Sequence, residues 1–375
     1  MFQDLWSKDL LSYRLSETLM KRYPNPNDYP YKSWSYSQGF MLWGMEALYR
    51  YTGDKKYYSY IMSYADTHVM PDGTLLKFDG SSMDDMMSGA IIVWAWVQTK
   101  QEKFLKACRT IRGSFGDYPR NSDGGFWHNR KTKGQMWVDG VFMGQMFLTK
   151  YGHYIDDCQY CFDEAGLQLE VIYDRCGQTD SGHKNGLILH AYSEDRQAPW
   201  ADKTTGLSPE VWSEGLGWYA LILPQVLELM PVNHPEYDRL VRQYRELLQS
   251  LKKHQSAENG LWFQVVDRGD RGDNWNDTSG SAMFVYSIQK AVELGIASGE
   301  EFAPAAAKGW NGLKAKAKIN DAGLVDIYDA CDGLCVKADY DTYINYPKKT
   351  NAKEAVAAFL WAAAIMEKDG LKGHA

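Results

Sequence analysis

Residues 123–143 combine a carboxylate, an imidazole and two indoles at a spacing that could serve sugar chemistry. The chain reads Asp123-Gly-Gly-Phe-Trp-His128 and then Met136-Trp-Val-Asp-Gly-Val-Phe-Met143. Asp139 lies between Trp137 and a glycine that opens an apolar helix, where burying a carboxylate is costly unless it has a partner or a task. An acid beside aromatic rings is typical of a sugar-processing site. The alternative is a helix N-cap, because Asp often precedes an apolar helix.

A second acid stands in a similar position. Asp84 and Asp85 precede the apolar segment that begins at Met86, so either could be a cap or an active-site carboxylate. His128 and His190 follow two equivalent predicted turns. A lone histidine is more often an ordinary hydrogen-bonded residue, but this shared placement favours contact with a ligand.

Aromatic residues make up 14% of the chain, and several precede apolar helices instead of lying within them. Sugar rings pack their C–H faces on aromatic rings, while their hydroxyl groups need carboxylate, imidazole or amide partners. The combination favours a carbohydrate ligand, although large aromatics could also simply fill the ends of a barrel. The residues concerned are Trp34, Tyr36, Trp127, Trp137, Trp212, Trp218, Trp262 and Trp275.

A repeated turn organises the chain around these residues. Five times a polar residue leads through glycine into a short apolar run, which predicts a tight turn and a short strand. The five segments are Pro71-Asp-Gly-Thr-Leu-Leu, Asp123-Gly-Gly-Phe-Trp-His, Lys184-Asn-Gly-Leu-Ile-Leu-His, Glu258-Asn-Gly-Leu-Trp-Phe and Asp321-Ala-Gly-Leu-Val-Asp.

Two kinds of helix alternate along the sequence. Helices that are apolar all round are expected at 38–51, 83–98, 139–150, 214–230, 279–294 and 354–366. Helices with one apolar face are expected between them, for example at 55–68, 103–115, 156–173 and 235–254.

This alternation predicts an all-α fold, an (α/α)6 barrel of six inner and six outer helices, with the short turn-strands on the active-site rim. An open solenoid of helical hairpins is the alternative. No linker divides the chain, so we expect residues 1–375 to form a single catalytic domain. In a closed barrel the beginnings of the inner helices meet at one rim. That rim would gather Asp84, His128, Asp139, His190, Trp212 and Trp218.

Charge and cysteine usage limit the partners. With 41 basic and 48 acidic residues the net charge is −7, and no basic cluster occurs, so we expect neither nucleic acid nor membrane as a partner. The opening segment Met1–Asp9 lacks the pattern of a signal peptide, which favours a cytoplasmic protein. Cys158/Cys161 and Cys331/Cys335 could form a zinc site, but buried structural thiols are the better interpretation.

Six motifs follow one another along the chain. They are Trp34-Ser-Tyr-Ser-Gln-Gly39, Met83-Asp-Asp85, Gly125-Phe-Trp-His128, Met136-Trp-Val-Asp-Gly140, His190-Ala-Tyr192 and Trp212-Ser-Glu-Gly-Leu-Gly-Trp218. Together they resemble the unsaturated rhamnogalacturonyl hydrolases of glycoside hydrolase family 105, relatives of the unsaturated glucuronyl hydrolases. The resemblance extends from about Trp34 to Ala364.

The resemblance implies an (α/α)6 barrel without a cofactor or metal. It also implies removal of a 4,5-unsaturated uronic acid from the nonreducing end of lyase-generated oligosaccharides. By position, Asp139 matches the family's catalytic acid/base and Asp84 its second carboxylate. The residues expected to bind the substrate are Tyr36, His128, Trp137, His190, Trp212 and Trp218.

An unsaturated uronide is a vinyl ether, so a carboxylic acid can protonate C4 and water can then attack C5, where positive charge develops. Asp139 would donate the first proton and accept one from the water. This dual role predicts a pKa raised by aromatic neighbours and by a second carboxylate, which Asp84 can supply.

One position departs from the pattern. Glu214 stands where relatives carry Arg, so another cation is expected to hold the uronate, with Arg120, Lys131, Lys133 and Arg196 as candidates. Rhamnose as the neighbouring sugar is therefore less secure than the unsaturated uronide. A conventional glycosidase or epimerase on the same barrel and a noncatalytic sugar-binding protein remain alternatives. Both a monomer and a homodimer are compatible with the sequence.

Overall fold

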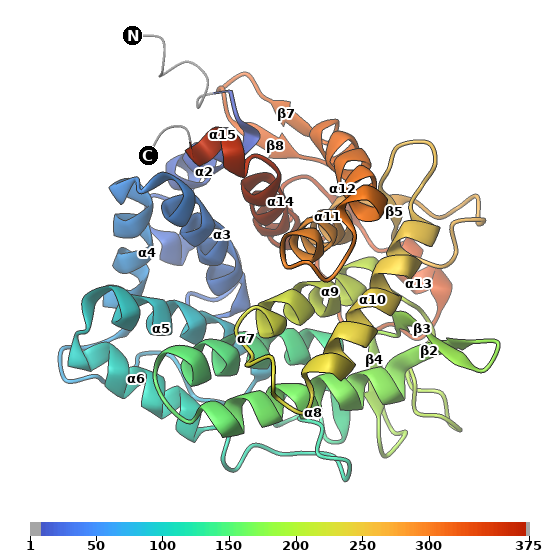
Figure 1. The fold of residues 1–375 in the computed structure, drawn as a ribbon, viewed down its shortest axis with the longest axis horizontal. Coiled ribbons are helices and arrows are strands. Elements are labelled where there is room, and N and C mark those ends of the chain that lie inside the picture. The colour runs from blue at the N-terminus through green and yellow to red at the C-terminus, as the bar shows by residue number, and fades with distance from the viewer. Residues whose placement is uncertain (1–8, 373–375) are drawn as a thin grey trace.

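The structure is a computed structural model that describes residues 9–372. Most of the opening segment used to judge the signal peptide lies outside these residues. Within them, six helices form an inner ring (Figure 1). Each packs on the next, and the last packs on the first, so the ring is closed and the open solenoid is excluded. The six are α3 (Tyr36–Thr52), α5 (Met87–Thr99), α7 (Val138–Tyr154), α9 (Ser213–Leu227), α11 (Thr278–Glu293) and α14 (Lys353–Met366).

Six further helices surround this ring in the described part of the chain (Figure 1). They are α2 (Leu11–Arg22), α4 (Lys55–His68), α6 (Glu102–Gly113), α8 (Cys158–Cys176), α10 (Tyr237–His254) and α12 (Gly299–Lys314). The predicted (α/α)6 barrel is therefore confirmed. Shorter helical segments are η1 (Pro26–Asp28), η2 (Met83–Asp85), α13 (Tyr340–Ile344) and α15 (Lys368–Lys372).

Sequence periodicity explains which helix lies where. In α10, the buried residues Leu240, Tyr244, Leu247, Leu248 and Leu251 follow a spacing of three and four, so one face packs inward and the rest meets solvent. In α9, every residue is buried, because helices surround it on all sides.

The strands are short and pair antiparallel in twos. Three of the five predicted turn-strands contain a strand of the structure, namely β3 (His183–Ile188), β5 (Trp262–Phe263) and β8 (Val325–Ile327). The first two segments form the predicted turns at 71–72 and 122–123, but the predicted strands are wrong: Leu75 and Phe126 each form only an isolated bridge, because the chain turns away after one paired residue. The strands are β1 (Gln135–Trp137), β2 (Gly177–Asp180), β3 (His183–Ile188), β4 (Ala191–Ser193), β5 (Trp262–Phe263), β6 (Asn276–Asp277), β7 (Ala317–Ile319), β8 (Val325–Ile327), β9 (Ala330–Cys331) and β10 (Lys348–Lys349).

The connections differ at the two ends of the barrel. Inner helices pass to outer helices through short links, such as 53–54 and 100–101, whereas outer helices return to inner helices through long segments that contain the strands. The first turn of every inner helix therefore lies at the end that carries these segments. This arrangement brings residues distant in sequence to one rim.

No helix in residues 9–372 is long and apolar enough to cross a lipid bilayer. The six cysteines are unpaired, and Cys158 and Cys335 are exposed, so the expectation of buried thiols is wrong for these two. Cys158 is the first residue of α8 and Cys335 lies in a loop, where neither packs into the core. No group of three or more His, Cys, Asp or Glu side chains in the described residues is arranged to hold a metal ion.

Candidate active site

A cavity of about 170 Å³ opens at the rim where the inner helices begin. Its walls come from the first turns of α3, α7, α9 and α14, from η2 before α5, and from a loop at 333–335. The lining residues are Tyr31, Tyr36, Asp84, His128, Trp137, Asp139, Met143, Trp212, Glu214, Trp218, Gly333, Leu334, Cys335 and Lys353.

Backbone hydrogen bonds between two short strands hold Asp139 in place. Strand β1 pairs with β4 so that Trp137 lies opposite Ala191, and the Val138 N–H donates to the His190 carbonyl at 3.1 Å. Asp139 follows as the second residue of α7, where the unpaired N–H groups of the first turn favour a negative charge. Gly140 is required next to it, because a Cβ there would lie 3.0 Å from His128 Nδ1.

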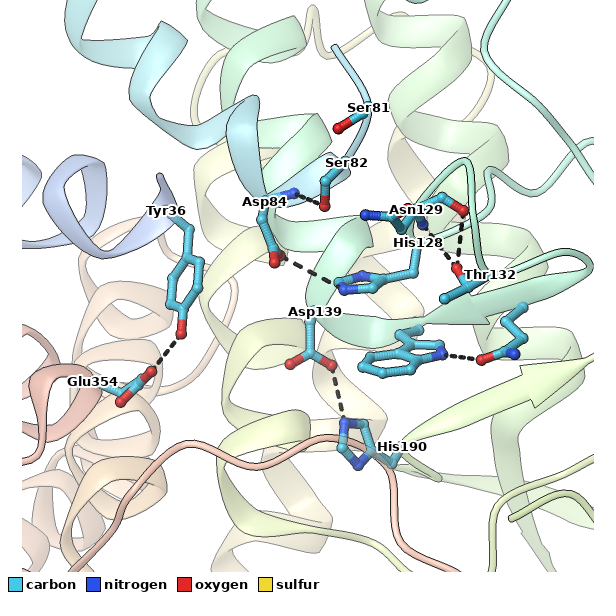
Figure 2. A network of polar contacts seen from close by, with 12 residues as sticks. Tyr36, Ser81, Ser82, Asp84, His128, Asn129, Thr132, Asp139, His190 and Glu354 are labelled. Atoms are coloured by element: carbon cyan, nitrogen blue, oxygen red, sulfur yellow. Dashed lines mark hydrogen bonds and ion pairs between the residues drawn. The ribbon is translucent and has the colours of Figure 1, made fainter. Parts of the chain in front are cut away.

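His190 holds the Asp139 carboxylate from behind. Its Nε2 lies 3.1 Å from Asp139 Oδ2 (Figure 2). Its Nδ1 lies 2.9 Å from the Tyr343 hydroxyl. The Lys337 N–H donates to that hydroxyl oxygen. The Tyr343 proton is then available to His190 Nδ1, which leaves the proton on Nε2 to be donated to Asp139.

The expected rise in the pKa of Asp139 is wrong for the free protein. Burial does raise the pKa, but the charge and hydrogen bond of His190, together with His128, lower it further, so the pKa lies below its ordinary value. The sequence placed aromatic rings and a second acid near Asp139 but did not pair it with an imidazole. Asp139 is therefore a carboxylate at neutral pH, ready to accept a proton.

Asp84 has the opposite electrostatic environment. Its Oδ1 lies 3.8 Å from His128 Nε2 (Figure 2), and its backbone N–H donates to Ser82 Oγ at 3.3 Å. Burial raises the pKa of Asp84, and the charge of the neighbouring Asp139 raises it as well. Although the charge of His128 acts in the opposite direction, the pKa lies above its ordinary value. The two carboxylates thus have pKa values shifted apart, a pattern seen in acid/base pairs. Asp85 does not line the cavity.

The aromatic residues divide into two groups. Tyr36, Trp137, Trp212 and Trp218 line the cavity, and the Trp137 ring stacks on His128 with centroids 4.3 Å apart. Trp34 and Trp262 belong to the core instead, where each indole N–H donates to a backbone carbonyl. Trp127 and Trp275 are also absent from the lining. Barrel filling thus accounts for Trp34 and Trp262.

Seven of the eight predicted site residues line the cavity, and the eighth, His190, lies behind it. Its side chain has 0% exposure, whereas that of Asp139 has 15%. The Trp212 ring covers His190 at a centroid distance of 4.6 Å. His190 therefore contacts the carboxylate and not the cavity itself.

Glu214 lines the cavity as an uncharged acid. Ser279 Oγ lies 2.7 Å from both Glu214 Oε2 and Asp277 Oδ2, but one hydroxyl proton can serve only one of them. Asp277 already accepts from the Gly280 N–H and the Ser213 hydroxyl. A proton on Glu214 lets this acid donate to Ser279 Oγ while the Ser279 hydroxyl donates to Asp277. Consistently, burial raises the pKa of Glu214 well above its ordinary value, with Glu354 and Asp277 adding to the rise.

Lys353 is the only Lys or Arg among the described residues that line the cavity. Its Nζ lies 2.6 Å from Glu354 Oε1, which also accepts the Tyr36 hydroxyl proton (Figure 2). Burial lowers the pKa of Lys353, but Glu354 raises it above the ordinary value, so the ammonium stays charged.

The four cations suggested by the sequence are absent from this lining. Arg120 is held by both oxygens of Glu164 at 2.8 and 2.7 Å. Lys131, Lys133 and Arg196 are exposed. Lys353 was not among the cations suggested by the sequence, although the start of the sixth inner helix was a recognisable rim position.

The profile of Glycosyl Hydrolase Family 88 matches residues 11–369. The chain is similar to the solved structure of a family 105 glycoside hydrolase from C. acetobutylicum ATCC 824. The TM-score is 0.88 at 28% sequence identity, and the match covers 96% of this chain and 99% of that one. The unsaturated glucuronyl hydrolase of Bacillus sp. GL1 shares the fold, with a TM-score of 0.71 at 14% identity over 99% and 98% of the two chains.

Sequence relatives cover a shorter region. Protein Atu3128 of Agrobacterium fabrum is 36% identical over 130 residues, which are 35% of this chain and 55% of that protein. An unsaturated 3S-rhamnoglycuronyl hydrolase of Alteromonas is 27% identical over 124 residues, 33% of this chain and 29% of that protein. The match thus spans about half of the first relative and less of the second. Because the family profile covers nearly all of the sequence, the chain belongs to Glycosyl Hydrolase Family 88.

Proposed function

We propose that this protein removes a 4,5-unsaturated uronic acid from the nonreducing end of lyase-generated oligosaccharides by hydration of the C4=C5 double bond. The observation that carries the proposal is the pairing of Asp139 with His190 and of Asp84 with His128 at one aromatic-walled cavity. Membership of the family and the likeness to a family 105 hydrolase support it.

Asp139 acts as the acid and then as the base. The free protein holds it as a carboxylate, so the first step requires a proton on the Asp139–His190 pair. A bound uronate brings a second negative charge and removes water, and both effects favour protonation of Asp139. Protonated Asp139 transfers its proton to C4, and positive charge develops at C5 and on the ring oxygen.

Water then bonds to C5 and returns a proton to Asp139. The hemiketal opens to a C5 ketone and a hydroxyl at C1, and this hemiacetal releases the second sugar as an alcohol. One water is consumed, and the C1 bond is never attacked directly. Asp84 adds negative charge or a hydrogen bond near the developing cation.

The remaining lining residues serve binding. We assign the uronate carboxylate to Lys353, because that ammonium is the one permanent cation among the described lining residues. Neutral Glu214 does not repel the uronate, in contrast to an ionised acid. Tyr36, Trp137, Trp212 and Trp218 offer ring faces or edges to the sugar, and His128 contacts it beside Asp84. His190 is a positioning residue that acts through Asp139.

Domain organisation, cofactor use and oligomeric state are part of the same proposal. We infer a single catalytic domain over residues 1–375 that acts without a cofactor, as a monomer or homodimer. Six unpaired cysteines favour a reducing, cytoplasmic compartment. Light scattering coupled to gel filtration would distinguish monomer from homodimer.

The decisive experiment follows the ultraviolet absorbance of the conjugated double bond. The protein is incubated with unsaturated disaccharides from pectin and from glycosaminoglycan lyases, with Asp139→Asn as the control. Loss of absorbance with the unchanged protein alone supports the proposal. If no unsaturated uronide loses absorbance while a saturated glycoside is cleaved, the conventional glycosidase replaces it. Binding without any turnover would favour the noncatalytic alternative.

A further inference from the structure

A second cavity, of about 200 Å³, lies at the opposite end of the barrel. Its walls come mainly from the C-terminal halves of α3, α5, α7 and α9, whereas the candidate active site lies where the inner helices begin. Lys150 and Asp139 both belong to α7. Lys150 follows Asp139 by eleven positions, and the helical rise over this stretch separates them by about 16 Å. The two cavities are therefore distinct sites.

Lys150 is an incompletely paired ammonium in this second cavity. Its residue exposure is 3%, its Nζ donates to Gln225 Oε1 at 2.9 Å, and it forms no ion pair within residues 9–372. Gln225 is oriented for this role, because its Nε2 donates to the Tyr286 hydroxyl at 2.8 Å. An ammonium has three donors, so two remain without a protein acceptor.

The charged neighbours of Lys150 are already paired with one another. Glu46 Oε2 lies 3.5 Å from Arg50 Nε, and Glu228 Oε1 lies 2.6 Å from Lys290 Nζ. These two ion pairs carry no net charge, so Lys150 gives the cavity one uncompensated positive charge. Burial lowers the pKa of Lys150 to about 8, although Glu228 and Glu46 act in the opposite direction. A ligand with one negative charge would remove this penalty.

The other walls indicate a ligand with a carbon skeleton. The Lys150 ammonium lies 5.0 Å from the centroid of the Trp43 ring, and Val93, Val97 and Leu229 complete an apolar wall. The indole N–H of Trp94, which also lines the cavity, has no partner in the described residues. Gln98 and the two glutamates can accept from hydroxyl groups.

We propose that this cavity binds a small hydroxylated monocarboxylate, of the size of a sugar acid, with its carboxylate on Lys150. A phosphate ester would bring nearly two negative charges beside Glu46 and Glu228, which exceeds the one uncompensated charge. A neutral sugar would leave the ammonium without an anion. This site does not depend on the proposed reaction at the other end.

Calorimetric titration with D-galacturonate and D-glucuronate tests the site, with glucose as the uncharged control. We expect Lys150→Met to weaken binding to this cavity at least tenfold, because the anion loses its counter-charge. The matched control is Lys353→Met, which removes the cation of the other cavity and should leave the Lys150-dependent component unchanged. Turnover of an unsaturated disaccharide, measured without added sugar acid, should be unaltered in Lys150→Met.

A crystal of the unchanged protein soaked with the same sugar acid shows where the ligand lies, even if Lys150→Met fails to fold. Density with a carboxylate beside Lys150, together with the Lys150-dependent heat, supports the site. A titration in which Lys150→Met binds as well as the unchanged protein overturns it. So does a soak that leaves the cavity empty at concentrations that saturate the titration. Absence of turnover of unsaturated substrates by the unchanged protein would instead count against the proposed reaction.

Discussion

The Asp139 carboxylate accepts a hydrogen bond from an imidazole that is completely buried, with His190 Nε2 at 3.1 Å from Asp139 Oδ2. The contact sets both the orientation of the carboxylate and its charge in the free protein. It favours the ionised form, which suits the step in which water loses a proton. The protonation of C4 then requires that substrate binding offset this preference.

Asp139→Asn should retain the fold and the affinity for the sugar but lose activity by about a thousandfold or more, since removing a proton donor costs on the order of 10²–10⁴ and this residue serves two steps. Steady-state kinetics on an unsaturated disaccharide, with calorimetry for binding, provides the measurement. Turnover close to that of the unchanged protein in a folded Asp139→Asn variant would remove Asp139 from the mechanism.

His190→Ala should lower kcat and shift the basic limb of the pH profile of kcat/KM to higher pH, because the first step requires Asp139 in its protonated form. The imidazole lowers the pKa of Asp139, so its loss lets that pKa rise. The matched variant is His190→Gln, whose amide can still donate to the carboxylate and should recover part of the rate. A merely structural role predicts a lower kcat with an unmoved pH limb.

The alternation of helix types was sufficient to predict the barrel, because an inner helix needs apolar residues all round and an outer helix needs them on one face. The Asp139–His190 contact was not accessible in the same way. It depends on the register of β1 against β4, two three-residue strands more than fifty positions apart. Lys353 was overlooked because a lysine at a helix start has no distinctive sequence signal. Its importance comes from which side chains surround it.

Glu214→Gln should change stability by less than about 1 kcal/mol and leave KM within a fewfold, because Glu214 is already uncharged and an amide can still donate to Ser279. Glu214→Arg should destabilise the protein by about 3 kcal/mol or more, since it places an unpaired charge in a buried position. Thermal unfolding and kinetics check both variants. A large loss of activity in a stable Glu214→Gln protein would show that Glu214 acts as an anion.

Trp218→Ala should destabilise the protein by about 3–5 kcal/mol in addition to raising KM, because the residue is 1% exposed and its ring packs on Phe40 and Phe142. Trp218→Phe keeps an aromatic ring there and should lose less stability. Any rise in KM without a comparable fall in kcat then reports sugar contact. An unchanged KM in a folded Trp218→Phe protein would assign Trp218 to the core alone.

The last prediction separates hydration from direct cleavage at C1. In heavy-oxygen water the label should enter at C5 of the released uronate, and in deuterated water deuterium should enter at C4, because Asp139 delivers a solvent-derived proton there. The saturated uronide with the same second sugar should bind without hydrolysis, since it offers no double bond to protonate. Mass spectrometry and NMR of the products locate both labels. Oxygen label at C1, or rapid cleavage of the saturated compound, would instead assign Asp84 and Asp139 to a conventional two-carboxylate mechanism.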